Sequence, residues 1–341
     1  MLTYVSNCSR VEKISLKVIA REVGVSIATV SLVLNGKNKN GRVSKEMSVK
    51  ILDKAAELNY IPNSLAKGLK MGHSKSIGLI VADISNVFFG TLALHIQNYA
   101  EKEGYTVVIG NTNEELEEMH KMITFLNSRQ VDGLIITPAE GGESLIEEMI
   151  GDKIPLVLVD RSFPELDVAS VLINNFEICY RSTLQLLDRG SRNVAFISYK
   201  QNQFHTNERK RGFVKAAQET GIYKAENIRE VRYHHLNEDV DKVITQLLKK
   251  KGKIDAIFFA TNSISVAGVR SLFKHGFVAQ KDIRVMCFDE SEGIVLFPFR
   301  IPYIKQPIEE MAKKALKLLI DQIEKRETTM NQLFIDAELI F

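Results

Sequence analysis

Polar and aromatic residues collect around the end of the apolar run at 77–84. Asp83 lies near the end of this run, and Asn86 and the paired rings of Phe88 and Phe89 follow it. Small ligands of folds with parallel strands bind where the strands end, so side chains of this kind could form a binding site. An aromatic face can meet the C–H groups of a sugar while a carboxylate accepts hydrogen bonds from its hydroxyls. Because both rings lie in an apolar context, we expect one of them to belong to the core.

The residues needed for other chemistry are missing. The sequence contains no GxGxxG after a strand, no GxxxxGK[ST], no GxSxG and no HExxH, which excludes the common nucleotide, hydrolase and zinc-protease motifs. His234 and His235 are adjacent, so strand or helix geometry points them apart rather than toward one metal ion. Three widely spaced cysteines lack metal spacing, and we expect reduced thiols at Cys8, Cys179 and Cys287. We expect no enzyme activity, no metal and no cofactor.

Short β-rich runs alternate with amphipathic stretches over residues 76–341. The predicted strands are 77–84, 106–111, 133–137, 155–160, 170–174, 194–198, 256–260 and 284–288. Helices are predicted at 92–102, 115–129, 144–150, 207–220 and 308–324, with a last strand pair or extended tail at 333–341. This alternation predicts parallel sheets covered by helices on both faces. One sheet of about ten strands would be unusual, so we expect two α/β lobes.

Charge divides the 341 residues unevenly. The net charge of the whole chain is only +3. Residues 1–75 hold 13 Lys and Arg against five Asp and Glu, a net charge of +8, which leaves −5 for the rest. A basic module for a polyanion attached to an acidic body is the arrangement that this asymmetry predicts.

The basic segment carries the pattern of two short helices joined by a turn. Ser15 is placed to cap the first helix, Gly24 to end it, and Ser26 to cap a second that runs to about Leu34. This is the signature of a helix-turn-helix, whose second helix enters the major groove of DNA. The second helix is expected to bury Val30, Val33 and Leu34 and to turn outward Ile27, Ala28, Thr29, Ser31 and Leu32.

A basic loop and a third helix follow. Residues 37–42, which end at Arg42, suit phosphate contacts, and Ser44 can cap a helix that breaks at Tyr60. Its apolar side is expected to comprise Val49, Ile51, Leu52, Ala55, Ala56 and Leu58. A generic three-helix domain would show a similar pattern, and the net charge of +8 favours the DNA-binding alternative.

Motifs in this order resemble the lactose/galactose-repressor (LacI/GalR) family. The matching pieces are ISLKVIAREVGVSIATVSLVLNG at 14–36, VS at 43–44, LNYIPN at 58–63 and LAKGLK at 65–70. The resemblance implies that 63–70 form a hinge helix on operator DNA and that Leu69 enters the minor groove, where an apolar wedge bends the duplex. The DNA-binding residues expected are Ser15, Ser26, Ile27, Ala28, Thr29, Ser31, Asn35, Arg42, Tyr60, Asn63, Ala66, Leu69 and Lys70.

Two positions depart from the family's pattern in this segment. Leu32 stands where many relatives carry Arg, so one phosphate or base contact is lost. Gly68 replaces a better helix former, which costs the hinge helix about 0.5–1 kcal/mol and makes its folding depend more on DNA.

The body resembles the family's effector domain, which is similar to periplasmic sugar-binding proteins. The matching pieces are IGLIVADISNVFF at 77–89, VDGLII at 131–136, VDR at 159–161, RKRGF at 209–213, FD at 288–289 and KQP at 305–307. The resemblance implies two lobes that the chain crosses between three times, with Arg209 and Asp289 bonded to a ligand in the cleft. The expected effector-binding residues are Asp83, Asn86, Phe88, Phe89, Gln203, His205, Arg209, Asn262 and Asp289.

The expected domains follow from these matches. They are a disordered tail at 1–13, a helix-turn-helix domain at 14–62, a hinge helix and linker at 63–75, and an effector-binding and dimerisation domain at 76–341. The fold class is thus an all-α head with a hinge helix joined to a two-lobed α/β domain. Lobe one is expected at about 76–174 and 307–330, and lobe two at about 175–306 and 331–341.

Departures in the body bear on the ligand. Ser263 in TNS at 261–263 and Asn174 before Asn175 stand where relatives often have Asp. Losing two acids favours an anionic ligand, and Arg209 can bind a carboxylate or phosphate in bidentate fashion as well as donate to hydroxyls. The expected effector is therefore a sugar, a uronic acid or a sugar phosphate.

The function predicted is a sequence-specific transcriptional regulator of carbohydrate genes, with a repressor favoured. Its partners are double-stranded operator DNA, the effector and a second copy of the chain, as a homodimer or a tetramer. No apolar run reaches the roughly 20 residues of a membrane span, and no secretory signal is seen, so a cytoplasmic protein is expected. The alternative is a solute-binding sugar receptor without a DNA role.

Overall fold

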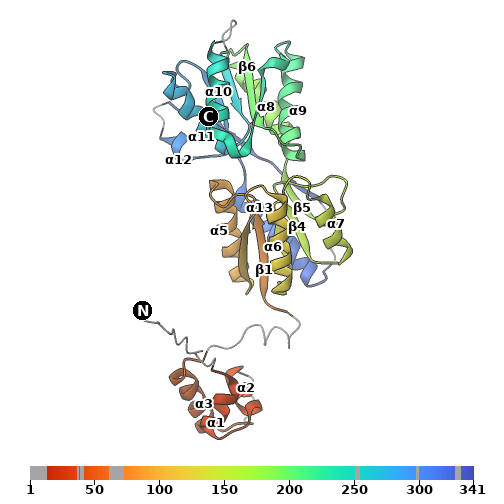
Figure 1. Ribbon diagram of the computed structural model, residues 1–341, viewed down its shortest axis with the longest axis vertical. Coiled ribbons are helices and arrows are strands. Elements are labelled where there is room, and N and C mark those ends of the chain that lie inside the picture. The colour runs from red at the N-terminus through yellow and green to blue at the C-terminus, as the bar shows by residue number, and fades with distance from the viewer. Residues whose placement is uncertain are drawn as a thin grey trace, which may run out of the picture. The chain divides into compact units, whose positions relative to one another are not determined.

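The computed structural model describes residues 14–36, 38, 42–60, 73–249, 254–296, 299–326 and 332–341. The chain forms two compact units, Met1–Gly72 and His73–Phe341 (Figure 1). The predicted tail at 1–13 and the hinge helix at 63–70 lie outside the described residues.

The described residues of the first unit form three helices, α1 (Leu16–Val23), α2 (Ile27–Leu34) and α3 (Lys45–Glu57). Gly24 ends α1 in the left-handed conformation, with φ of 76°. Ser26 and Ser44 cap α2 and α3 as predicted, since their hydroxyls accept from backbone N–H groups three residues on, at 3.1 and 3.2 Å. The small core is made of Ile19, Ala20, Val23, Val30, Val33, Ile51 and Ala55.

Two details of this unit were predicted wrongly. Ser15 occupies the position before α1, but its side chain makes no capping hydrogen bond. Val49, Leu52 and Ala56 of α3, expected on its apolar side, are exposed, the first two by 56% and 50%. The reason is size: α3 contacts two helices of eight residues each, which cover only the stripe that contains Ile51 and Ala55.

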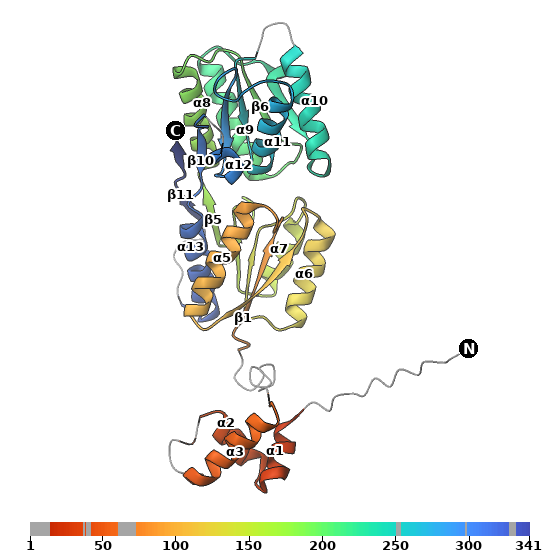
Figure 2. The ribbon, with the colours of Figure 1, turned by 90° about the vertical axis from the view of Figure 1, so that its left-hand side faces the viewer.

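The second unit has two six-stranded sheets, one in each lobe (Figure 2). The first has the order β11-β5-β4-β3-β1-β2, with β1 (Ser76–Val81), β2 (Thr106–Asn111), β3 (Leu134–Ile136), β4 (Leu156–Val159), β5 (Ser170–Ile173) and β11 (Gln332–Ile335). The second has the order β12-β10-β9-β8-β6-β7, with β6 (Val194–Tyr199), β7 (Ile228–Val231), β8 (Ala256–Phe259), β9 (Arg284–Phe288), β10 (Tyr303–Lys305) and β12 (Glu338–Ile340). Every strand pair is parallel except β10 with β12.

Helices cover both faces of each sheet, as the strand–helix alternation predicts. In lobe one, α5 (Val87–Lys102) and α13 (Ile308–Ile323) pack on one face, and α6 (Leu116–Ser128) and α7 (Glu143–Gly151) on the other. In lobe two, α8 (Asn175–Asp188) and α9 (Phe204–Glu219) lie opposite α10 (Leu236–Lys249) and α11 (Asn262–Lys274). Short helices complete this lobe at Ala225–Asn227, Tyr233–His235 and α12 (Glu292–Val295). Among the described helices, none combines the length and apolarity that crossing a membrane requires.

The chain crosses between the lobes three times, and each connection is short. The crossings are residue 174 between β5 and α8, residues 306–307 between β10 and α13, and residues 336–337 between β11 and β12. The sequence assigned 331–341 to lobe two, but β11 pairs with β5 of lobe one and only β12 joins the second sheet (Figure 2). The last ten residues therefore belong to both lobes.

Candidate functional site

Eight of the nine predicted effector residues line one cavity between the lobes. The cavity measures about 50 Å³, which is room for about one or two water molecules. Asp83, Asn86, Phe88, Phe89, His205, Arg209, Asn262 and Asp289 are the predicted residues that line it. Other residues that were not predicted to bind the effector also line this cavity. They are Glu114, Asp160, Arg161, Tyr199, Gln201, Tyr233, Thr261, Ser263 and Gln306.

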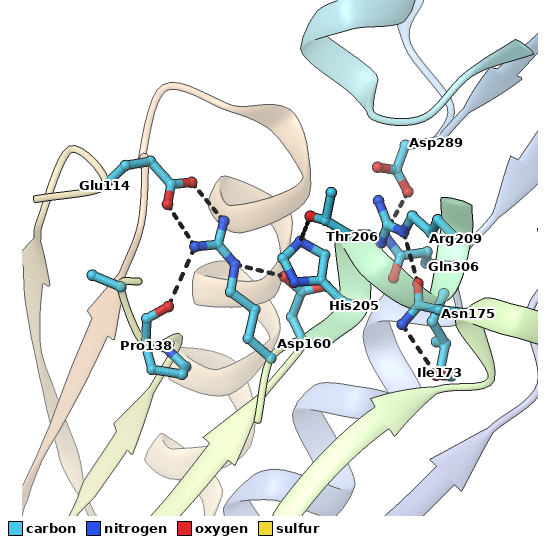
Figure 3. Close-up of polar contacts among 12 residues, drawn as sticks. Glu114, Pro138, Asp160, Ile173, Asn175, His205, Thr206, Arg209, Asp289 and Gln306 are labelled. Carbon is cyan, nitrogen blue, oxygen red and sulfur yellow. Dashed lines mark hydrogen bonds and ion pairs between the residues drawn. The ribbon is translucent and has the colours of Figure 1, made fainter. Parts of the chain in front are cut away.

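Arg209 is a buried cation held at fixed geometry by lobe two. Its Nε donates to Asn175 Oδ1 at 2.7 Å (Figure 3), and its Nη1 donates to the Ala260 carbonyl at 2.9 Å. The guanidinium lies 3.7 Å from the centre of the Phe288 ring. Burial lowers the pKa of Arg209, and the Asp160 carboxylate opposes that effect. Among the described residues Nη2 makes no hydrogen bond, so its N–H groups and the second N–H of Nη1 are left to donate to a ligand.

Asp289 follows β9 in a left-handed backbone conformation, with φ of 65°. Its Oδ1 accepts from Gln306 Nε2 at 2.8 Å (Figure 3). Burial raises the pKa of the Asp289 carboxyl to about 6, although the Arg209 charge pulls it down. A positive φ is uncommon for Asp, and here it directs the carboxylate into the cavity that Gln306 also lines.

A buried ion pair belongs to lobe one. Arg161 donates to both carboxylate oxygens of Glu114, at 2.6 and 2.5 Å, and to the Pro138 carbonyl at 3.3 Å. Its Nε lies 3.5 Å from an oxygen of Asp160. Burial alone would lower the pKa of Arg161, but the Glu114 carboxylate raises it above its usual value. Burial raises the pKa of Asp160, and the charges of Arg161 and Arg209 counteract that shift.

His205 is buried near both arginines and is therefore held neutral. Burial lowers its pKa well below the usual range, and the charges of Arg161 and Arg209 lower it further. Its Nε2 lies 3.2 Å from Thr206 Oγ1, while its buried Nδ1 has no partner among the described residues. Gln306 Oε1, Tyr199 Oη and Arg161 Nε are further buried atoms of the lining without a hydrogen-bond partner there. Unpaired buried polar atoms are rare, so these atoms point to a polar ligand.

The paired phenylalanines serve the core and the cavity together. Phe88 and Phe89 are each 4% exposed, and their rings meet edge to face at 5.0 Å. Both belong to the hydrophobic core, and both line the cavity. The expectation that one ring is core and the other a platform is therefore too simple.

Side-chain contacts join the lobes across the cleft. Tyr233 of lobe two donates to Asp83 Oδ2 at 3.1 Å, and the next residue, His234, contacts Glu115 at 2.8 Å. Asn202 N donates to Glu140 at 2.9 Å. A sugar cannot enter so small a space without displacing these contacts or widening the cleft.

The adjacent histidines each have an acidic neighbour, Glu115 for His234 and Glu238 for His235. Among the described residues, no group of His, Cys, Asp and Glu side chains could hold a metal ion.

Gln203 is the predicted effector residue that does not line the cavity. In the amide orientation that suits its neighbours, its oxygen accepts from Arg161 Nη1 and Glu140 N, both at 3.1 Å. Gln203 therefore contacts Arg161, which lines the cavity. The lining residues missed from the sequence were detectable in part, because Asp160 and Arg161 lie at the carboxyl end of a predicted strand, as Asp83 does.

The candidate DNA surface lies at the start of α2. Ser26, Ile27 and Ala28 are exposed, and Thr29 is half-buried with its hydroxyl 2.8 Å from that of Ser26. Among the other predicted residues, Asn35 donates to the Ser31 carbonyl at 2.7 Å, and Arg42 is exposed. Tyr60 packs against the small core. The predicted DNA contacts at Asn63, Ala66, Leu69 and Lys70 lie outside the described residues.

Two family models match the chain. Residues 15–63 match bacterial regulatory proteins, lacI family. Residues 74–341 match periplasmic binding proteins and sugar binding domain of LacI family.

Named relatives match along most of their length. The chain is 32% identical to a ribose operon repressor of Halalkalibacterium halodurans, over 96% of this chain and 95% of that protein. It is 26% identical to catabolite control protein A of Priestia megaterium, over 90% and 92%. These names are those of regulators and not of enzymes.

Solved structures share the fold. The lac repressor dimer bound to operator and the anti-inducer ONPF has a TM-score of 0.82 at 20% identity, and the match covers 97% of this chain and 98% of that one. A LacI transcriptional regulator from Alkaliphilus metalliredigens, complexed with D-xylulofuranose, has a TM-score of 0.67 at 23% identity, over 78% and 97%.

Proposed function

Because this chain belongs to the LacI family of bacterial regulatory proteins and is a DNA-binding transcriptional regulator, we propose that its cleft binds a neutral monosaccharide as the effector. The observation that carries the proposal is the presence of buried polar atoms without a partner, among them His205 Nδ1 and Gln306 Oε1, in a cavity shared with Arg209 and Asp289. These groups supply hydrogen-bond donors and acceptors in several directions, as the hydroxyls of a sugar require.

The charges of the cavity favour a neutral ligand over an anion. Carboxylates from Asp83, Glu114, Asp160 and Asp289 surround it, and the bidentate pair with Glu114 occupies Arg161. Only Arg209 is left to balance an anion, and two of the carboxylates lie near it. Asp160 and Glu114 thus supply acids that offset the missing ones at Asn174 and Ser263. The named relatives support a pentose, since one is a ribose operon repressor and another holds D-xylulofuranose.

A calorimetric panel tests the ligand class. We expect D-ribose or another neutral pentose to bind, and D-glucuronate and D-ribose 5-phosphate to bind at least about tenfold more weakly, because one uncompensated charge in a buried site costs more than a hydrogen bond gains. Binding of the anions alone would contradict the proposal.

Affinity for the bound sugar should fall as the pH drops below about 6. A hydroxyl donates best to the ionised Asp289, whose pKa burial raises to about 6. We expect a loss of up to about tenfold per pH unit below that value, and Asp289→Asn should remove this dependence. The stability of the free protein should depend on pH in the opposite direction. Because the pKa of Asp289 is higher in the folded than in the unfolded state, this group adds stability as the pH falls from above 6 toward about 4. Titrations by calorimetry and urea unfolding at pH 5 to 8 separate the two effects.

For DNA, we propose that two copies of the chain read a near-palindromic operator with the start of α2. Support for a homodimer comes from large apolar side chains on the surface of lobe one, of which Ile84, Val87, Leu94 and Ile109 are 42–56% exposed. Sedimentation would distinguish a dimer from a tetramer.

Ile27→Ala should change which operators bind and leave the fold intact. Ile27 is 47% exposed, so the substitution should alter the free energy of unfolding by less than about 0.5 kcal/mol. Loss of its contact with a base edge should lower operator affinity about tenfold. Selection from random duplexes with the full chain gives the operator, and gel shifts compare the two proteins. The same affinity and the same selected sequence for both would place recognition elsewhere.

A further inference from the structure

The chain enters lobe one through a segment held by a single carboxylate. Ser74 N and Ser74 Oγ both donate to Asp132 Oδ1, at 2.7 and 3.0 Å. Lys75 N donates to the other oxygen, Oδ2, at 2.9 Å. Asp132 lies in the loop before β3, far along the chain from the segment that it holds. Residues 73–75 are the first described residues after the DNA-binding unit, so this contact is made where the two units are joined.

Further contacts fix the backbone of the same segment. Asp132 N donates to the Ser76 carbonyl at 2.7 Å, and Thr106 N donates to the Lys75 carbonyl at 2.9 Å. Lys75 has φ of 52°, a conformation that a lysine rarely adopts without support. Its ammonium lies 4.2 Å from the centre of the buried Tyr105 ring. These contacts fix the backbone of residues 74–76, at the start of lobe one.

Lobe two contains the same device at the equivalent place. Asp255, in the loop before β8, accepts from Arg192 N at 2.7 Å and from Asn193 N at 3.1 Å. Its own N–H donates to the Asn193 carbonyl at 3.1 Å. β8 pairs with β6 as β3 pairs with β1. The two sites differ in the chain that is held: Asp255 holds the connection from α8, which stays inside lobe two, whereas Asp132 holds the connection to the DNA-binding unit and accepts from the Ser74 hydroxyl as well.

We propose that Asp132 is a positioning residue for DNA binding, and that it transmits the orientation of lobe one to the segment that leads to the DNA-binding unit. The proposal rests on the assigned role as a DNA-binding regulator. Without this carboxylate, Ser74 and Lys75 would lose their main restraints, and a rotation of lobe one would no longer move the chain that leaves it in a defined direction.

The expected effect is large because the freed backbone must be ordered again on the operator. Two released residues carry a conformational entropy cost that corresponds to roughly a tenfold loss of affinity or more. Non-specific DNA binding depends on phosphate contacts of the helical unit, so it should change little.

The test compares Asp132→Ala with Asp255→Ala in the full chain. Both variants lose the same kind of contact, so both should lose similar amounts of stability in urea. We expect only Asp132→Ala to bind the selected operator about tenfold more weakly, with unchanged binding to random duplex DNA. Amide hydrogen exchange at Lys75 should become faster in that variant and stay slow in Asp255→Ala.

Several outcomes would overturn the proposal. Equal operator affinities of the two variants would reduce Asp132 to a structural role. If Asp132→Ala does not fold, Asp132→Asn, which keeps an oxygen for Ser74 and loses the acceptor for Lys75, should show a smaller loss, and wild-type operator affinity in that variant would also refute it. If the unaltered protein itself bound no selected duplex, the role of the chain in DNA binding would fail. That outcome is distinguishable from a failure of the role proposed for Asp132, in which the unaltered protein binds and the variants bind equally well.

Discussion

Arg209→Met should lower affinity for the effector sugar by about a hundredfold. Arg209 presents a charged donor group to the cavity, and a hydrogen bond to a charged group is worth roughly 1.5–3 kcal/mol. The variant also leaves Asn175 Oδ1 and the Ala260 carbonyl without the donors at 2.7 and 2.9 Å. Methionine keeps apolar contact with the Phe288 ring, so the substitution removes charge more than volume. Calorimetry with the sugar identified by the panel measures the loss.

A matched control lies two residues further along α9. Arg211 also places its guanidinium over a ring, that of Phe176, at 4.6 Å, but its side chain is 65% exposed. Arg211→Met should bind the sugar as the unaltered protein does. Arg209→Lys should fail like Arg209→Met, because an ammonium cannot hold both partners and a ligand in one plane. Full affinity in Arg209→Met would show that the buried arginine has only a structural role.

Glu114→Ala should destabilise the two-lobed unit by about 3–5 kcal/mol, the usual cost of leaving one member of a buried ion pair uncompensated. The side chains of Arg161 and Glu114 are 8% and 7% exposed, so water cannot replace the lost carboxylate. Asp160, the other acid beside Arg161, is itself buried and has a raised pKa. Urea unfolding of the full chain, followed in the second unit, measures the change.

The control for this prediction is Glu118→Ala. Glu118 pairs with Lys121 on the surface of α6, where the side chains are 39% and 54% exposed. Such a pair contributes less than about 1 kcal/mol. Similar losses in both variants would mean that Glu114 and Arg161 are not an isolated buried pair in solution.

The sequence predicted the central strands well because they are buried on both faces. β4, β6, β8 and β9 are continuous apolar runs, and their expected bounds differ from the observed ones by a residue or two at most. It missed β7 and β10. β7, at the edge of its sheet, is interrupted by Arg229 and Glu230, and β10 has only three residues. The placement of β11 could not be read either, since nothing local distinguishes which sheet a terminal strand will join.

The site was predicted where its residues follow strands or carry family motifs. Arg209, Asp289 and the residues after β1 were found in this way. Tyr233 and Glu114 were missed because they lie in connections without a motif, and only the closure of one lobe on the other brings them to the cavity. That Arg161 is already paired could not be foreseen, since its partner lies 47 residues away.

The three short connections between the lobes leave few ways for the lobes to move. Sliding of one lobe along the other would stretch all three connections at once. Rotation of the lobes about a line through the connections is therefore the motion that costs the least energy. The three connections together form the hinge between the lobes, and two hydrogen bonds of the cavity involve it. Gln306, which donates to Asp289, lies in one connection, and Asn175, which accepts from Arg209, directly follows another. A ligand that reorders these hydrogen bonds therefore acts on the hinge itself, where a small local change turns into a large angular one.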